Sequence, residues 1–157
     1  MNITKVKHDG TRTHIEWMRG DPDEPDNWSM NSKEHPRQEL KDALGALKPH
    51  VCDICELPDE WAQRMEVRGV SFSWARDIMG ACITAFKNLE NSDSPLVLNT
   101  PHKPSSPYSE TGDDKNCLSA ECQTALENVL NEAELYVKGQ RAQGSLFGVE
   151  DEAERGG

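Results

Sequence analysis

The sequence has no long apolar run and few aromatic residues. Aromatic side chains make up 6% of the 157 residues, and hydrophobic ones make up 35%. No stretch approaches the roughly 18 to 20 consecutive apolar residues of a membrane-spanning helix, and Met1 is not followed by the apolar segment of a secretory signal. We therefore expect no membrane span, one modest core and a soluble protein of the cytoplasm.

Basic residues are also scarce. The chain has 17 Lys and Arg against 28 Asp and Glu, which gives a formal net charge of −11. Nucleic acids and anionic lipids attract proteins through basic residues, so we expect no direct nucleic-acid binding and no membrane partner. The acidic excess favours solubility. An alternative interpretation is an acidic surface that imitates the phosphates of DNA and blocks a DNA-binding protein.

The common catalytic motifs are missing as well. The sequence has no nucleophile elbow, zinc-protease motif, phosphate-binding loop or dinucleotide glycine pattern. His8, His14, His35 and His50 have no nucleophile or carboxylate at a helpful spacing. We therefore predict a protein that is not an enzyme and needs no cofactor.

Five cysteines are present, and they permit one metal hypothesis. Cys52 and Cys55 form a C-x-x-C beside His50, while Cys117 and Cys122 form a looser pair. Both pairs lie in segments with helical patterning, and zinc sites usually combine two tight spacings. The odd count without an export signal favours reduced thiols buried in the core over a zinc site.

The first part of the chain predicts a hairpin followed by a loop. Residues 3–17 have strand patterning around Asp9-Gly10, a pair typical of a two-residue type I′ turn. Residues 21–35 begin with two prolines and several carboxylates, which predicts an exposed acidic loop.

Residues 36–56 have apolar side chains three and four apart, which predicts a helix with a kink or break at Pro49. Residues 67–74 alternate as a half-buried strand, and Gly69 is suited to a bulge. Residues 79–89 fit a helix or a strand, and we favour a strand because Cys82-Ile83-Thr84 is β-prone. Residues 95–99 form a further predicted strand.

Residues 100–117 are rich in Pro and Ser and predict a long loop. Residues 118–137 have the clearest helical stripe, with Ser119 as N-cap and Gly139 ending the helix. The order ββαβββα predicts an α+β fold, an antiparallel sheet of about five strands with two main helices on one face. We expect a single domain over residues 1–140 and a flexible acidic tail over residues 141–157.

The tryptophans and the segment 99–104 both have plain structural interpretations. The four tryptophans, Trp17, Trp28, Trp61 and Trp74, suit stacking platforms for bases. Phe72 and Trp74 share a strand face and few basic residues adjoin the tryptophans, so we expect them in the core. The segment 99–104 contains His102 beside Lys103, which together suit a phosphate, but Asn and Thr before a proline favour hydrogen bonds within a turn.

The tail contains the clearest binding motif. Gln143-Gly144-Ser145-Leu146-Phe147 resembles the pentapeptide by which bacterial replication and repair proteins bind the β sliding clamp. The resemblance implies that Leu146 and Phe147 fill an apolar cleft while Gln143 and Ser145 contact its edge. Gly144 departs from the leucine common at that position, so we expect weaker binding. The alternative is that Leu146 and Phe147 complete the core of this chain itself.

Residues 94–102 and 133–147 are similar to a group of small, uncharacterised proteins of bacteriophages and prophages. The resemblance implies a phage accessory protein of DNA replication or recombination in the cytoplasm of the bacterial host. With the tail motif, it predicts recruitment to the host sliding clamp. The alternative function is an acidic inhibitor of a host DNA-binding or defence protein.

Overall fold

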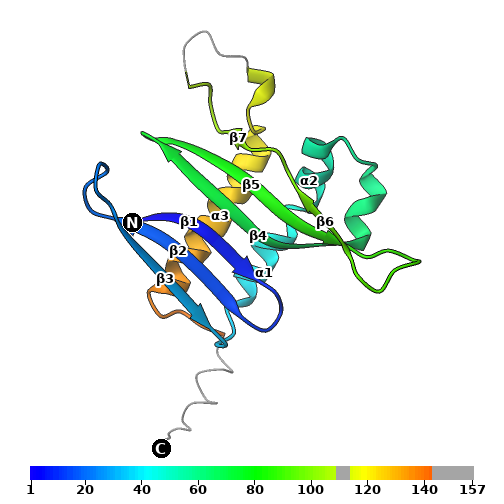
Figure 1. Ribbon diagram of the computed structural model, residues 1–157, viewed down its shortest axis with the longest axis horizontal. Coiled ribbons are helices and arrows are strands. Elements are labelled where there is room, and N and C mark those ends of the chain that lie inside the picture. The colour runs from blue at the N-terminus through cyan, green and yellow to red at the C-terminus, as the bar shows by residue number, and fades with distance from the viewer. Residues whose placement is uncertain (109–113, 143–157) are drawn as a thin grey trace, which may run out of the picture.

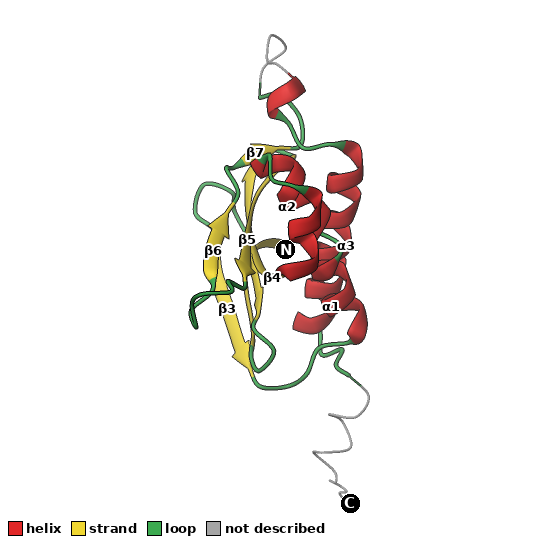
Figure 2. Cartoon of the chain, turned by 90° about the vertical axis from the view of Figure 1, so that its right-hand side faces the viewer, coloured by secondary structure: helices red, strands yellow, loops and turns green. Residues whose placement is uncertain are grey.

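The computed structural model describes residues 1–108 and 114–142. The chain forms two layers, an antiparallel sheet and a layer of helices that covers one face of it (Figure 2). This arrangement confirms the predicted α+β class and the placement of the helices on one face. The opposite face of the sheet carries no helix in the described part of the chain.

The sheet has more strands than predicted. Its order is β3-β2-β1-β4-β5-β6, and the short β7 pairs with β5 (Figure 1). All pairs are antiparallel. The strands are β1 (Asn2–His8), β2 (Thr13–Arg19), β3 (Asp26–Ser32), β4 (Met65–Ala75), β5 (Ile78–Lys87), β6 (Leu96–Asn99) and β7 (Lys103–Pro104).

The prediction of an acidic loop over residues 21–35 is partly wrong, because β3 forms within this range. This strand pairs with β2 along its whole length and lies at the edge of the sheet. Trp28 and Met30 face the helix layer, since they pair with the core residues Trp17 and Ile15. Hydrogen bonds of the backbone ladder, rather than deep burial, hold this strand in place.

The first hairpin is confirmed, but its turn is longer than the predicted type I′ turn. Only Gly10 of the Asp9-Gly10 pair has positive φ. The loop spans residues 9–12, and Asp9 N–H donates to the Arg12 carbonyl at 3.3 Å. The Asp9 carboxylate accepts hydrogen bonds from the backbone N–H groups of Thr11 and Arg12. The aspartate therefore closes the turn through its side chain.

The predicted helix over 36–56 is two helices, α1 (Gln38–Gly45) and α2 (Lys48–Cys55). The break was expected at Pro49, but Pro49 lies in the first turn of α2. A proline in a continuous helix would clash with the carbonyl four residues earlier, which belongs to Gly45. The first helix accordingly ends at Gly45.

The strand predictions for the middle of the chain are confirmed. The register between β4 and β5 shifts between Val67 and Gly69, which is the expected bulge. The predicted order ββαβββα is nevertheless wrong, because β3, the helix break and β7 add elements. The loop predicted over 100–117 contains β7 and a short 3-10 helix at Asp114–Asn116, and a second 3-10 helix spans Asp59–Arg64.

The last helix, α3 (Ala120–Val137), packs along the sheet and beside α1. Its buried stripe includes Leu126, Val129 and Ala133, each fully enclosed. Ser119 caps it as predicted, because its hydroxyl accepts the Cys122 N–H at 3.1 Å. The cluster of buried apolar side chains extends from Ile3 to Tyr136. None of the described helices is long and apolar enough to cross a bilayer.

Candidate functional site

The open face of the sheet gathers basic side chains. Lys5 and Lys7 alternate with Val6 on β1, so both face away from the helices while Val6 is buried. Lys7 pairs with His14 of β2 on one side and with Gly69 of β4 on the other. Neither lysine forms an ion pair within the described part of the chain.

Arg68 extends this basic surface from the bulge of β4. Its guanidinium lies over the ring of Phe86, 4.1 Å from the ring centroid, and Nη2 donates to Glu66 Oε1 at 3.2 Å. The Nε–H is buried and has no hydrogen-bond partner among residues 1–108 and 114–142. The bulge at Gly69 turns Arg68 onto the open face. The result is a flat cation stacked on an aromatic ring.

A polar network borders the surface on the side of β2 and β3. Arg12 Nη1 donates to Asn31 Oδ1 at 3.0 Å, and His14 Nε2 lies 2.7 Å from Glu16 Oε2. The hydrogen bond with His14 lowers the pKa of the Glu16 carboxyl, and the nearby positive charge of Lys5 lowers it further. Glu16 therefore stays ionised and orients His14.

Two hollows open on this face. One, of about 500 Å³, is lined by basic and polar side chains including Arg12, His14 and Asn31, and also by the carboxylate residue Asp9. The other, of about 180 Å³, lies toward β5. The two share Lys7, Arg68 and Phe86, so they form one concave surface across the sheet. We call the residues Lys5, Lys7, Arg12, His14, Arg68 and Phe86 the basic face.

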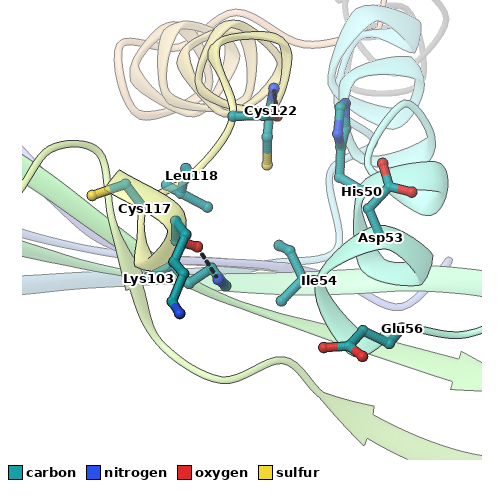
Figure 3. Close-up of a pocket in the computed structure, with 10 residues that line it drawn as sticks. His50, Asp53, Ile54, Glu56, Lys103, Cys117, Leu118 and Cys122 are labelled. Carbon is teal, nitrogen blue, oxygen red and sulfur yellow. Dashed lines mark hydrogen bonds between the residues drawn. The ribbon is translucent and has the colours of Figure 1, made fainter. Parts of the chain in front are cut away.

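A second cavity, of about 300 Å³, lies between α2 and the start of α3 (Figure 3). His50, Asp53 and Glu56 come from the side of α2, and Lys103 lies opposite them. Lys103 Nζ donates to the Lys115 carbonyl at 3.4 Å. Charges of both signs line this cavity, so it has no clear preference for an anion or a cation.

The cysteines do not assemble into a metal site within the described residues. Cys117 and Cys122 line the cavity, whereas Cys52 is buried in the core. No group of three or more His, Cys, Asp or Glu in the described part of the chain is placed to hold a metal ion. Burial raises the pKa of Cys122 to about 11 and also raises that of Cys52 and Cys55. These thiols are protonated at neutral pH and are poor nucleophiles and metal ligands.

The segment 99–104 makes structural hydrogen bonds, but they reach β5 and β4, whereas the sequence predicted hydrogen bonds within a turn. Thr100 is buried, and its hydroxyl accepts the Ile83 N–H at 2.8 Å. His102 Nε2 lies 2.7 Å from Ser73 Oγ. Among the described residues, no carboxylate hydrogen-bonds to His102, so the pair lacks the third group that orients a catalytic histidine. We assign it to fixing this loop on the sheet.

The tryptophans divide between core and surface. Trp17 is buried as predicted, and Trp74 packs against the core while donating to the Ile3 carbonyl at 2.8 Å. Trp61 packs at the core margin, and the Lys87 ammonium lies 4.3 Å from its ring centroid. Trp28 is 50% exposed at the edge strand, so core packing is wrong for this residue.

The predicted clamp-binding residues Gln143, Ser145, Leu146 and Phe147 lie outside the described residues. The two residues before them are attached to the domain, which corrects the predicted start of the tail at residue 141. Arg141 Nε donates to Glu34 Oε1 at 2.7 Å, its guanidinium covers the Tyr136 ring, and Ala142 N–H donates to the His35 carbonyl at 2.9 Å.

Comparison with known proteins finds no matching family model, no matching curated protein and no matching solved structure. The assignment of a site therefore depends on the geometry of this chain. Sequence reasoning missed the basic face. The spacing of Lys5 and Lys7 on one strand face was a visible signal, but their proximity to Arg68 depends on strand pairing.

Proposed function

We propose that this chain is a non-enzymatic phage accessory protein of DNA replication or recombination, which the segment Gln143 to Phe147 recruits to the host sliding clamp. The observation that carries the proposal is the attachment of the chain immediately before this segment. Arg141 and Ala142 are bound to the domain, and Gln143 is the next residue.

The packing of the domain supports the same proposal. The core cluster draws its buried side chains from residues between Ile3 and Tyr136. Leu126, Val129 and Ala133 within it are fully enclosed. We infer that Leu146 and Phe147 are not needed by this core and are available to a partner, and adjacent Leu and Phe suit an apolar cleft.

A pull-down with purified clamp tests this proposal. We expect Leu146→Ala/Phe147→Ala to reduce retention of the full chain by at least about tenfold, since buried apolar anchors dominate such interfaces. The matched control is Leu96→Ala/Val97→Ala, an exposed apolar pair on β6. Equal retention of wild type and the tail variant would overturn the proposal.

An acidic inhibitor is the second candidate, favoured by the exposed carboxylates on the helix layer. They follow one another along α1, α2 and the adjoining 3-10 helix, namely Asp42, Asp53, Glu56, Asp59 and Glu60. This candidate predicts displacement of a short DNA duplex from a purified basic DNA-binding protein of the host. Asp53→Lys/Asp59→Lys would abolish the displacement, while Leu146→Ala/Phe147→Ala would leave it intact.

A further inference from the structure

We propose that the basic face binds single-stranded nucleic acid, with Lys5 and Lys7 on phosphates and the stacked Arg68 on a base. This inference goes beyond recruitment to the clamp and uses different residues. The sequence led us to expect no direct nucleic-acid contact, because that expectation used the net charge of the whole chain. The fold distributes the charge unevenly.

The first argument is that basic and acidic side chains are concentrated on different layers of the domain. Lys5, Lys7, Arg12 and Arg68 lie on the open face, where Glu16 and Glu66 are the acidic residues of the same strands and Asp9 lines the larger hollow beside Arg12. The exposed carboxylates of α1 and α2 belong to the other layer. An anionic partner that approaches the open face therefore meets an excess of positive charge, despite the net charge of the chain.

The second argument comes from the position of Arg68 over Phe86. The Arg68 guanidinium lies over the Phe86 ring, 4.1 Å from its centroid, and Arg planes and aromatic rings are the surfaces on which unpaired bases stack. Its Nε–H lacks a partner in the described structure. An acidic peptide would use the charges but not the planar surface, so the combination favours a polynucleotide.

The third argument comes from the shape of the basic face. The two hollows share Lys7, Arg68 and Phe86 and cross the sheet from β2 to β5. Four strands spaced about 4.8 Å apart give a path of roughly 14 Å. Ser71 of β4 and Thr84 of β5 also line the smaller hollow. This path suits a few nucleotides of a single strand, whose bases are free to stack, whereas those of a duplex are paired and hidden.

The number of cations sets the expected salt dependence. For single strands the logarithm of the affinity falls with the logarithm of salt by about 0.7 per neutralised phosphate. Phosphate contacts from Lys5 and Lys7 give an expected slope of about −1.4 on this basis, since Arg68 contacts a base. The acidic helix layer keeps the affinity modest, because it repels any strand that extends past the sheet.

Fluorescence anisotropy with a fluorescein-labelled oligothymidylate and the full chain tests the proposal. We expect Lys5→Ala/Lys7→Ala to weaken binding about tenfold and to bring the slope close to zero, since both phosphate contacts are lost. The matched control, Lys48→Ala/Lys138→Ala, removes the same charge from the helix layer and should bind as wild type does. Circular dichroism confirms that each variant is folded.

Other outcomes would overturn the proposal. These are equal binding by wild type and Lys5→Ala/Lys7→Ala, tighter binding of the matching duplex, or competition by polyglutamate that exceeds competition by unlabelled oligonucleotide. Leu146→Ala/Phe147→Ala should bind the oligonucleotide as wild type does. Failure at the basic face is therefore distinguishable from failure of clamp recruitment.

Discussion

Gly80 of β5 lies beneath the hydrogen bond that fixes the 99–104 loop. A Cβ at this position would come within 2.6 Å of Ser73 Oγ and closer still to His102 Nε2. Both atoms are ends of side chains that can rotate away, so a methyl group would displace the pair. At residue scale, the absence of a side chain permits a contact between β4 and a loop that follows β6.

Gly80→Ala should therefore destabilise the protein by about 1 kcal/mol, the net contribution of one hydrogen bond. Urea unfolding measures the change. In a His102→Ala background the same substitution should cost much less, because the displaced partner is already gone. An undiminished cost in that background would show that the methyl group acts through another contact.

His8 gives the protein a pH dependence. Its side chain is buried, and Nδ1 lies 3.1 Å from Thr13 Oγ1. Burial lowers the pKa of His8 below 6.5, and the nearby charge of Lys41 lowers it further. The unfolded chain then binds a proton that the folded chain does not, so stability falls as the pH drops through 6.5 toward the folded pKa.

His8→Gln should flatten this part of the profile. We expect wild type to lose stability between about pH 7 and pH 5.5, and the variant to lose less over the same window. Urea midpoints at the two pH values measure the difference. Identical losses in both proteins would assign the dependence to other groups.

At the scale of elements, α3 depends on its N-cap. Ser119→Ala removes the acceptor of the Cys122 N–H and should destabilise the protein by about 1 kcal/mol. Ser119→Asp should restore most of the loss, since aspartate accepts the same hydrogen bond and complements the helix dipole. Thermal unfolding compares the three proteins. A Ser119→Asp variant as unstable as Ser119→Ala would contradict the capping role.

The elements that were predictable have strong local patterns. The stripe of α3, the alternation of β4 and the β-prone residues of β5 each identify an element without reference to the rest of the chain. The edge strand β3 was missed because its stability comes from pairing with β2, and its side chains are mostly exposed. The turn after β1 was misjudged because the Asp9 side chain closes a longer loop.

The candidate site was the least predictable part. Lys7 and Gly69 are far apart in the sequence, yet they are neighbours across β1 and β4. The net charge of the whole chain hides the concentration of basic residues on one face, because the carboxylates belong largely to the helices and loops. Local patterns predicted most elements, while the position of each charge depends on the topology of the sheet.

At the scale of the whole molecule, the domain is expected to fold without the tail. Truncation after Ala142 should leave the melting temperature nearly unchanged, because we propose that Gln143 to Phe147 bind a partner and not the core of this chain. Truncation after Gly139 removes Arg141 and its bonds to Glu34, and should cost about 1 to 3 kcal/mol. Differential scanning calorimetry distinguishes the two. A large loss on truncation after Ala142 would mean that the tail belongs to the core.

The docking of Arg141 and Ala142 also restricts where a tail-bound molecule can sit. Phe147 is the fifth residue after Ala142, and a fully extended chain of five residues spans at most about 18 Å. Ala142 is fixed to His35, which follows the edge strand β3. A protein that binds Phe147 would therefore lie close to the end of the domain at which His35 holds Ala142. The surface of that protein would then determine how the open face of the sheet is oriented.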